Sequence, residues 1–162
     1  SRAACSRCLG GVAPDTPVNE RTSRNSGETK ELREDIKAVG RKKRVMCGLW
    51  TEVCINTACN SAMADGLEVY VGADVGGATS QAAQDYSMMR MIQAGARPVT
   101  WQQVLLEWQR DWAHKAPYDA VMNIVRQPSG ASGLGVDYAY TMVRKQPQRG
   151  SWKGEILKAP TA

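Results

Sequence analysis

The sequence predicts an α/β fold in which a parallel sheet is packed between helices. Three observations support this class. Short apolar runs typical of buried strands alternate with segments whose apolar side chains recur at helical spacing. The chain has 162 residues, which is enough for one hydrophobic core and short for two. Apolar residues make up 43% and charged residues 23% of it, the composition of an ordinary globular domain.

The first elements are predicted between residues 29 and 66. A helix is expected at 29–39, because Leu32, Ile36 and Val39 recur at helical spacing and Gly40 stops the helix. Residues 45–49 form a short apolar run of the kind seen in a buried parallel strand. A helix then follows and ends at Asp65-Gly66, with these residues on one apolar face: Ile55, Ala58, Cys59, Ala62 and Met63.

The same alternation continues to residue 113. The remaining elements are expected as a strand at 67–73, a loop at 74–80, a helix at 81–94, a strand at 98–100 and a helix at 101–113. In the first of these helices Tyr86 and Met89 are expected to face the core. The apolar stripe of the second comprises Val104, Leu105, Trp108 and Trp112.

The chain divides by its pattern into three parts. Residues 1–16 are rich in small residues, Arg and Pro without periodicity, so we expect an irregular or disordered lead there. Residues 17–115 hold the predicted core. Residues 116–162 begin with a short helix, pass through a Gly/Ser loop at 127–135 and end in a basic tail. We expect this extension to dock on a neighbouring subunit.

Charge and hydropathy bear on possible partners. The net charge of +5 lies largely in the run from Arg41 to Arg44 and in the two termini, which is typical of a solvated face, so nucleic acid is not expected as a partner. No apolar run approaches the ~20 residues that span a bilayer, and residues 1–8 lack the apolar region of a signal peptide. We therefore expect a cytoplasmic protein without a membrane partner.

The five cysteines favour a reducing compartment. Cys47, Cys54 and Cys59 lie inside apolar segments, where a disulfide framework is not expected. Cys5 and Cys8 have the spacing of half a zinc site, but no second pair and no nearby His would complete four ligands. No metal and no other cofactor is therefore predicted.

Cys54 is the main candidate for chemistry. In an open parallel sheet, functional groups collect at the carboxyl ends of the strands. Cys54 begins the helix after the strand at 45–49, where free N–H groups and the helix dipole favour a thiolate and could hold an oxyanion. On spacing alone, such a cysteine is more often a small buried side chain than a nucleophile.

A family resemblance favours the nucleophile. The run Gly48-Leu49-Trp50-Thr51-Glu52-Val53-Cys54 resembles the strand-to-helix turn of the isochorismatase-like cysteine hydrolases, in the subgroup that writes it G-L-W-T-E-V-C. The likeness extends through Leu67-Glu68-Val69-Tyr70-Val71, Pro98-Val99-Thr100-Trp101 and Arg110-Asp111-Trp112. Residues 133–143 are similar to an extension of the longer members, so the resemblance covers about three quarters of the chain.

The resemblance implies a three-layer αβα fold and a Cys-Lys-Asp triad that hydrolyses C–N bonds of a small molecule. It implies Cys54 as nucleophile, a cis peptide at Leu49-Trp50, and an oxyanion hole made by the N–H groups of Trp50 and Cys54. Thr51, Glu52 and Asn25 would shape the site, with Glu52 either ordering the turn or bridging subunits. It also implies a homo-oligomer, a tetramer or an octamer.

Three features depart from the family pattern. Counting back from Asn25 places Arg21 where the family has its catalytic Lys, and Arg21 would support the thiolate or form an ordinary ion pair. An aromatic residue is usual at the position of Gly27. The family's catalytic Asp ends a first strand some sixty residues upstream of the Lys, and only twenty residues precede Arg21, so we expect a sheet that lacks the family's first strands.

Two alternatives to a hydrolase remain open. Without the triad Asp, the chain could be a catalytically incompetent member that acts as an assembly subunit. The glycines of residues 72–80 follow a strand and suggest a flavodoxin-like nucleotide binder, although the order G-x-G-x-x-G and a P-loop Lys are missing. His114, the sole His, is expected to stabilise a helix carboxyl terminus rather than to act as a base.

Overall fold

The structure, a computed structural model, describes residues 22–145. They fall into two compact units, 22–121 and 122–145. The predicted irregular lead at 1–16 lies outside the described residues, and the division of the chain at 17 and 116 stays a prediction. No helix within 22–145 is long and apolar enough to cross a membrane.

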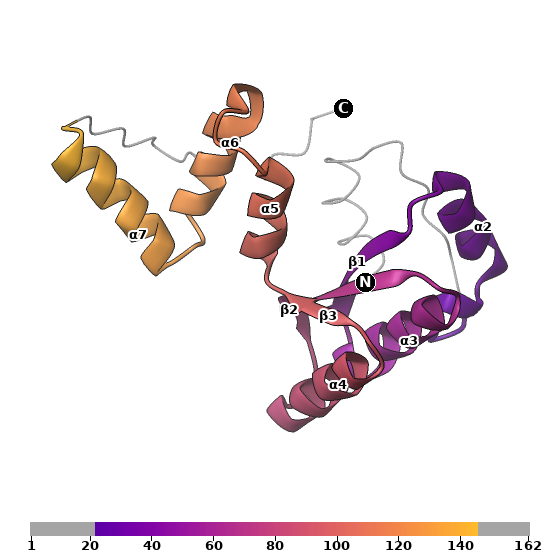
Figure 1. Cartoon of the computed structure of the whole chain (residues 1–162). Helices are drawn as coiled ribbons and strands as arrows, with labels where there is room; N and C mark the ends of the chain where they lie inside the picture. The colour runs from indigo at the N-terminus through magenta and orange to yellow at the C-terminus, as the bar shows by residue number, and fades with distance from the viewer. Residues whose placement is uncertain (1–21, 146–162) are drawn as a thin grey trace, which may run out of the picture. The chain divides into compact units, whose positions relative to one another are not determined.

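The first unit is built on a parallel sheet of three strands in the order β1-β2-β3 (Figure 1). The strands are β1 (Lys43–Leu49), β2 (Glu68–Gly77) and β3 (Arg97–Val99). Each is followed by a helix, which confirms the predicted α/β class and parallel pairing. In this sheet β1 is an outer strand, as expected for a sheet without the family's first strands.

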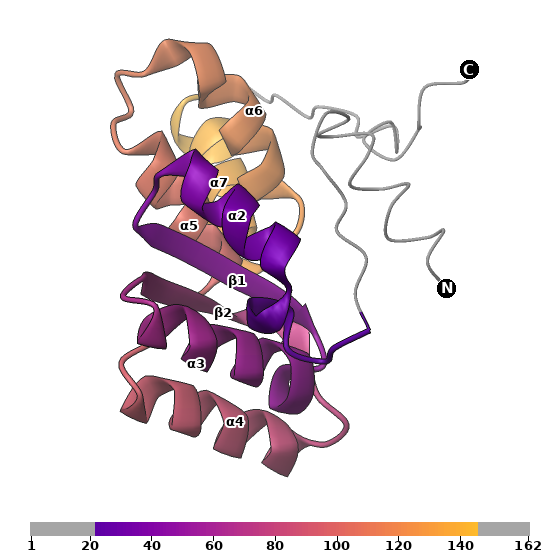
Figure 2. The ribbon, with the colours of Figure 1, turned by 90° about the vertical axis from the view of Figure 1, so that its right-hand side faces the viewer.

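The core lies between the sheet and two helices on one of its faces. These helices are α3 (Asn56–Ala64) and α4 (Gln81–Gln93), which run side by side (Figure 2). The central cluster consists of Cys59, Ala62, Val69, Val71, Met91 and Ala96, none of them more than 7% exposed. The apolar face predicted for the helix ending at Asp65 is therefore confirmed.

The helix before the sheet also forms as predicted. It is α2 (Lys30–Val39), preceded by the 3-10 turn η1 (Ser26–Glu28), and Gly40 ends it in the left-handed conformation at φ 67°. The prediction of a buried first strand is wrong, because β1 alternates between exposed and half-buried residues. Its more exposed residues alternate along the strand with half-buried ones, and Leu49 among them is 64% exposed.

The facing of α4 differs from the prediction. Tyr86 and Met89 are 71% and 51% exposed, whereas Ser87 and Met91 are buried. A polar contact contributes to this orientation, because Asn56 Nδ2 donates to the Ser87 carbonyl at 3.2 Å. Hydrophobic periodicity alone could not choose between the two faces, since apolar residues occur on both.

The helix after β3 is shorter than predicted. It is α5 (Trp101–Gln109), and Arg110 ends it at φ 60°. The predicted apolar stripe is wrong for Trp108 and Trp112, which are 76% and 54% exposed. The ring Nδ1 of His114 donates to the carbonyl of Gln109 at 3.1 Å, so this histidine does lie at a helix carboxyl terminus.

The chain beyond α5 is more helical than predicted. Its elements are α6 (Lys115–Arg126), α7 (Ala131–Tyr138) and the π-helical turn η3 (Ala139–Val143), so the expected loop at 127–135 is only a short connection. Gly133 makes the tight packing possible, since a Cβ there would lie 2.6 Å from the Arg126 carbonyl oxygen. The Arg126 guanidinium stacks over the Tyr140 ring at 4.3 Å and lies 3.5 Å from Asp137 Oδ1.

Candidate functional site

The candidate site is the segment that joins β1 to α3, residues 48–54, which we call the nucleophile turn. It contains a cis peptide between Leu49 and Trp50, as the resemblance implied. The Trp50 carbonyl accepts hydrogen bonds from the N–H groups of Val53 and Ile55, each at 3.2 Å. The chain thereby wraps into the π-helical turn η2 (Thr51–Ile55), which continues directly into α3.

Cys54 lies in η2, two residues before α3 begins, with a half-buried side chain and a free thiol. The Thr57 hydroxyl donates to the carbonyls of Val53 and Cys54 at 2.7 and 3.3 Å, which fixes the backbone on the helix side of the thiol. The other described cysteines differ sharply. Cys47 is exposed, whereas Cys59 is fully buried and burial raises its pKa to about 11.

Glu52 ties the nucleophile turn to the loop after β2. Its Oε1 accepts a hydrogen bond from the Thr79 N–H at 3.0 Å. Hydrogen bonds from the backbone N–H of Glu52 and from Thr79 hold the pKa of this carboxyl below its ordinary value. The second oxygen, Oε2, is shielded from solvent and has no partner within residues 22–145. Glu52 thus orders the turn within its own chain.

Thr51 is the most buried residue of the turn, at 2% exposure, and its hydroxyl has no hydrogen-bond partner in the described part of the chain. It is seated against the glycines at the end of β2, because a Cβ on Gly76 would lie 3.0 Å from Thr51 Oγ1. A bulge in β2 brings these glycines next to Thr51. The pairing of β1 with β2 shifts from Met46 opposite Val71 to Gly48 opposite Gly76.

Because of the bulge, part of the glycine-rich segment is strand rather than loop. Residues predicted as a loop from 74 onward belong to β2 as far as Gly77. Asp74 Oδ1 accepts from the Trp101 N–H at 2.9 Å and so caps the first turn of α5. Ser80 caps α4 through a hydrogen bond from the Ala83 N–H at 3.1 Å. The segment therefore joins strand ends and caps helices around the nucleophile turn.

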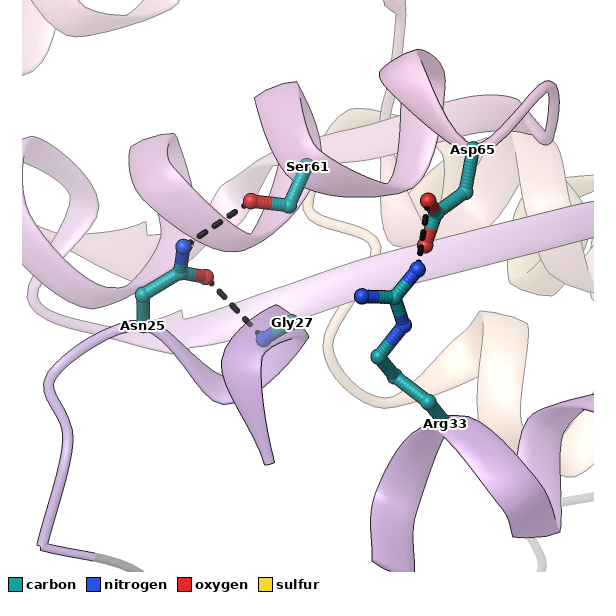
Figure 3. Close-up of polar contacts among 5 residues, drawn as sticks. All are labelled: Asn25, Gly27, Arg33, Ser61 and Asp65. Atoms are coloured by element: carbon teal, nitrogen blue, oxygen red, sulfur yellow. Dashed lines mark hydrogen bonds and ion pairs between the residues drawn. The ribbon is translucent and has the colours of Figure 1, made fainter. Parts of the chain in front are cut away.

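Asn25 contacts helix α3 through Ser61 (Figure 3). Its Nδ2 donates to Ser61 Oγ at 2.9 Å, and its Oδ1 accepts from the Gly27 N–H at 3.0 Å. Ser61 follows Cys54 by about two helical turns. The glycine at position 27 is explained by the same contact, because a Cβ there would lie only 2.6 Å from the Ser61 Cβ.

Several predicted groups lie outside residues 22–145. Arg21, the residue at the catalytic Lys position, and the pair Cys5 and Cys8 are among them. Between residues 22 and 145 no group of three or more His, Cys, Asp or Glu side chains is arranged to hold a metal ion. The structure thus places Trp50, Thr51, Glu52 and Cys54 in one turn, and Asn25 contacts Ser61 of α3. Whether Asn25 shapes the site stays a prediction.

Sequence reasoning missed two polar contacts that hold the turn. Asn56 is 2% exposed and fixes the start of α3 to α4 through the Ser87 carbonyl. Thr79 provides the N–H for Glu52. A polar Asn on an otherwise apolar helix face was a visible signal for the first contact. Nothing in the sequence pairs Glu52 with Thr79, since 27 positions separate them.

Comparison with known proteins places the chain in a family. The family model described as "Isochorismatase domain" matches residues 5–103. The "Probable hydrolase YcaC" of Escherichia coli (strain K12) is 34% identical over 100 residues, which are 61% of this chain and 48% of that protein. The "Isochorismatase domain-containing protein 2" of Xenopus laevis is 31% identical over 107 residues, 65% of this chain and 52% of that protein.

Solved structures show the same relationship. YcaC from Pseudomonas aeruginosa, solved with hexane-2,5-diol and covalent acrylamide, has a TM-score of 0.73 at 26% identity and covers 79% of this chain and 63% of its own. YcaC from Escherichia coli, described as an octameric hydrolase of unknown specificity, has a TM-score of 0.71 at 27% identity, with 85% and 64% covered. The chain spans about half the length of the curated relatives it matches.

Proposed function

Because this chain belongs to the isochorismatase family, we propose that it acts as a hydrolase on C–N bonds of a small amide, with Cys54 as the nucleophile. The observation that carries the proposal is the position of the Cys54 thiol. The thiol is free and half-buried. It belongs to the helical turn Thr51–Ile55, which follows β1 and the cis Leu49-Trp50 peptide. Backbone N–H groups at the start of such a turn can hold the oxyanion that forms when a cysteine attacks a carbonyl carbon.

The proposed reaction proceeds in two steps. The Cys54 thiol gives up its proton as its sulfur attacks the amide carbon, and the N–H groups of Trp50 and Cys54 stabilise the oxyanion. The C–N bond then breaks, and the amine leaves with the proton that the thiol gave up. Water then cleaves the thioester, which releases the acid and returns the thiol. Arg21 would supply positive charge near the thiolate, and Thr51 and Glu52 would hold the turn in place.

A relative supports the reactive thiol. The Pseudomonas aeruginosa YcaC structure contains covalent acrylamide. Acrylamide is an electrophile, and thiolates are among the protein groups to which it adds. The same chemistry gives a direct test on this chain, because Cys47 and Cys59 provide an exposed and a buried thiol for comparison.

The test is alkylation of the full chain with iodoacetamide at pH 7, with the rate at each cysteine read by peptide mass spectrometry. We expect Cys54 to react about tenfold faster than Cys47, as activated thiols do, and Cys59 to react most slowly because it is buried with a raised pKa. Cys54 reacting no faster than Cys47 would refute the nucleophile. Arg21→Ala should slow Cys54 specifically, whereas Arg21→Lys should preserve its rate.

The alternative function is an assembly subunit without catalysis. It is favoured by Arg21, which stands where the family has its catalytic Lys. A panel of small amides separates the two functions. Turnover that is lost in Cys54→Ser supports the hydrolase, whereas an unreactive Cys54 together with a stable oligomer supports the subunit.

We also propose that the chain forms a homo-oligomer, a tetramer or an octamer, with residues 116–162 between subunits. The octameric Escherichia coli relative supports this assembly. Light scattering of the full chain at micromolar concentration tests it, and a monomer would contradict it.

The free thiols at Cys47, Cys54 and Cys59 support a reducing compartment, and hence a cytoplasmic location.

A further inference from the structure

We propose that the outer face of α4 binds a second copy of this chain, with the two α4 helices packed in parallel about a twofold axis. The face consists of Ala82, Tyr86, Met89 and Gln93, which we call the α4 stripe. All four residues are exposed, Tyr86 and Met89 to 71% and 51%. The pairing rests on the proposed homo-oligomer and gives it a defined contact, and it does not depend on the proposed hydrolase activity.

The α4 stripe lies opposite the side of the helix that packs in the core. Ser87 and Met91 of α4 are buried. Because side chains advance by about 100° per residue around an α-helix, the stripe points away from Met91. Helix α4 joins β2 to β3, at the end of the described sheet away from β1, and α3 lies between α4 and α2 (Figure 2). The stripe is therefore remote from the outer edge of β1.

The spacing of the α4 stripe is that of paired helices. Its residues are separated by four, three and four positions, which is the alternation of the a and d positions in a heptad repeat. Ala82 and Met89 stand at d, and Tyr86 stands at a. Single exposed apolar side chains are common, but a row of them at this spacing is typical of an interface. Gln93 stands at the second a position, where a polar residue that faces its own copy fixes the register.

The charges beside the α4 stripe select the partner and its direction. Asp85 stands at g and Arg90 stands at e, five positions later. In parallel paired helices this is the separation at which a g residue of one helix faces an e residue of the other. The twofold axis repeats the contact, so Asp85 and Arg90 of each copy find an opposite charge. An antiparallel pair would instead bring Asp85 near its own copy and Arg90 near its own copy.

Both flanking charges are available to a second copy. In the part of the chain that the structure describes, neither Asp85 nor Arg90 forms an ion pair, and both are exposed. Gln81 Nε2 donates to Asp85 Oδ1 at 2.8 Å, which orients the carboxylate beside the stripe. Since the two sides of the stripe carry opposite charges, a second copy of the same helix is its complementary partner.

Disulfide formation through Ala82→Cys in the full chain tests the parallel direction. The two introduced thiols would face each other at a d position, within the ~7 Å between Cα atoms that a disulfide requires. In an antiparallel pair centred on the stripe they would lie about 16 Å apart. We expect mild oxidation to give a covalent dimer joined at position 82, identified by peptide mass spectrometry. Absence of this dimer would overturn the parallel pairing.

A matched control shows whether the contact is specific. Gln81 is exposed on the same helix but lies outside the α4 stripe. Gln81→Cys should therefore give at least about tenfold less dimer than Ala82→Cys, because its thiol cannot meet its own copy at disulfide distance. Equal yields from the two variants would show random collision and would refute the assigned face.

Charge reversal tests the flanking pairs, with the yield of the position-82 dimer as the measurement. Arg90→Asp and Asp85→Arg each place like charges across the axis, so each should lower the yield at least about tenfold in the Ala82→Cys background. The combined variant Asp85→Arg with Arg90→Asp should recover it, and so should a mixture of the two single variants. Lys30→Glu, a charge reversal on α2, should have no effect. Single variants that keep the wild-type yield, or a combination that fails to recover it, would overturn the pairing.

The outcomes separate this pairing from the proposals beside it. A monomer in light scattering would contradict both the homo-oligomer and the α4 pairing. An oligomer without the position-82 dimer would leave assembly to residues 116–162 and overturn the α4 pairing alone. Cys54→Ser should leave the dimer yield unchanged, since Cys54 lies in η2 and not on α4.

Discussion

Adding a methyl group at Gly27 should loosen the contact of η1 with α3. The Cβ of an alanine would lie 2.6 Å from the Ser61 Cβ, about 0.8 Å closer than the 3.4 Å at which ordinary contact begins. Overpacking of this kind costs about 1–3 kcal/mol. Displacing η1 would also lengthen the 2.9 Å bond from Asn25 to Ser61, which is worth about 1 kcal/mol.

One term opposes this destabilisation. Alanine reduces the freedom of the unfolded chain and thereby stabilises the fold by about 0.4–1 kcal/mol. We therefore expect Gly27→Ala to lower the free energy of unfolding by about 1–3 kcal/mol. Urea denaturation of the full chain, followed by circular dichroism, measures this difference.

A second substitution separates the steric clash from the lost hydrogen bond. Ser61→Gly removes both the hydroxyl and the clashing Cβ, whereas Ser61→Ala removes only the hydroxyl. Gly27→Ala should therefore cost little in a Ser61→Gly background and should remain costly in a Ser61→Ala background. The coupling free energy with Ser61→Gly should be about 1–3 kcal/mol. Strict additivity in both backgrounds would refute the close approach of Gly27 to Ser61.

Three further substitutions test other parts of the fold. Met91→Ala should lower the free energy of unfolding by about 2–5 kcal/mol in urea, since Met91 is 0% exposed; a loss of well under 1 kcal/mol would contradict the assigned core. Asp74→Ala should cost about 0.5–2 kcal/mol through loss of the Trp101 cap, whereas Asp74→Asn, which keeps an acceptor, should cost less. Glu52→Gln should lower Tm at pH 7 and lose this effect in acid. The folded-state pKa of Glu52 is lowered, so its stabilisation is present above the unfolded value of 4.5 and disappears as the pH falls through the folded value. A Tm difference between Glu52→Gln and the wild type that persists at pH 2 would contradict that assignment.

The order of elements in the core could be predicted because local patterns determine it. The apolar face of α3 and the stop at Gly40 depend on spacing and on a left-handed glycine, and both follow from neighbouring residues. The facing of α4 could not be predicted in this way. Its orientation involves the contact of Asn56 with Ser87, which joins residues 31 positions apart.

The sequence predicted the nucleophile turn but not the contacts from β2 that hold it in place. The resemblance anticipated the cis peptide at Leu49-Trp50, and the turn does contain it. The bulge adds three residues to β2 and gives no periodic signal in the sequence. It brings Asp74 to the start of α5 and Gly76 next to Thr51. Bulges are set by the pairing of two strands, so a pattern read along one strand does not reveal them.

The outer position of β1 has a consequence for handling the purified protein. Strands with unpaired edges are the places where copies of a protein adhere to one another, and charged side chains oppose such adhesion. Here the strand begins with Lys43 and Arg44 and follows Arg41 and Lys42, so that two approaching copies bring like charges together. Salt screens that repulsion, since the Debye length falls to about 3 Å at 1 M. Turbidity should therefore rise with ionic strength, and buffers of low salt should limit this adhesion during storage.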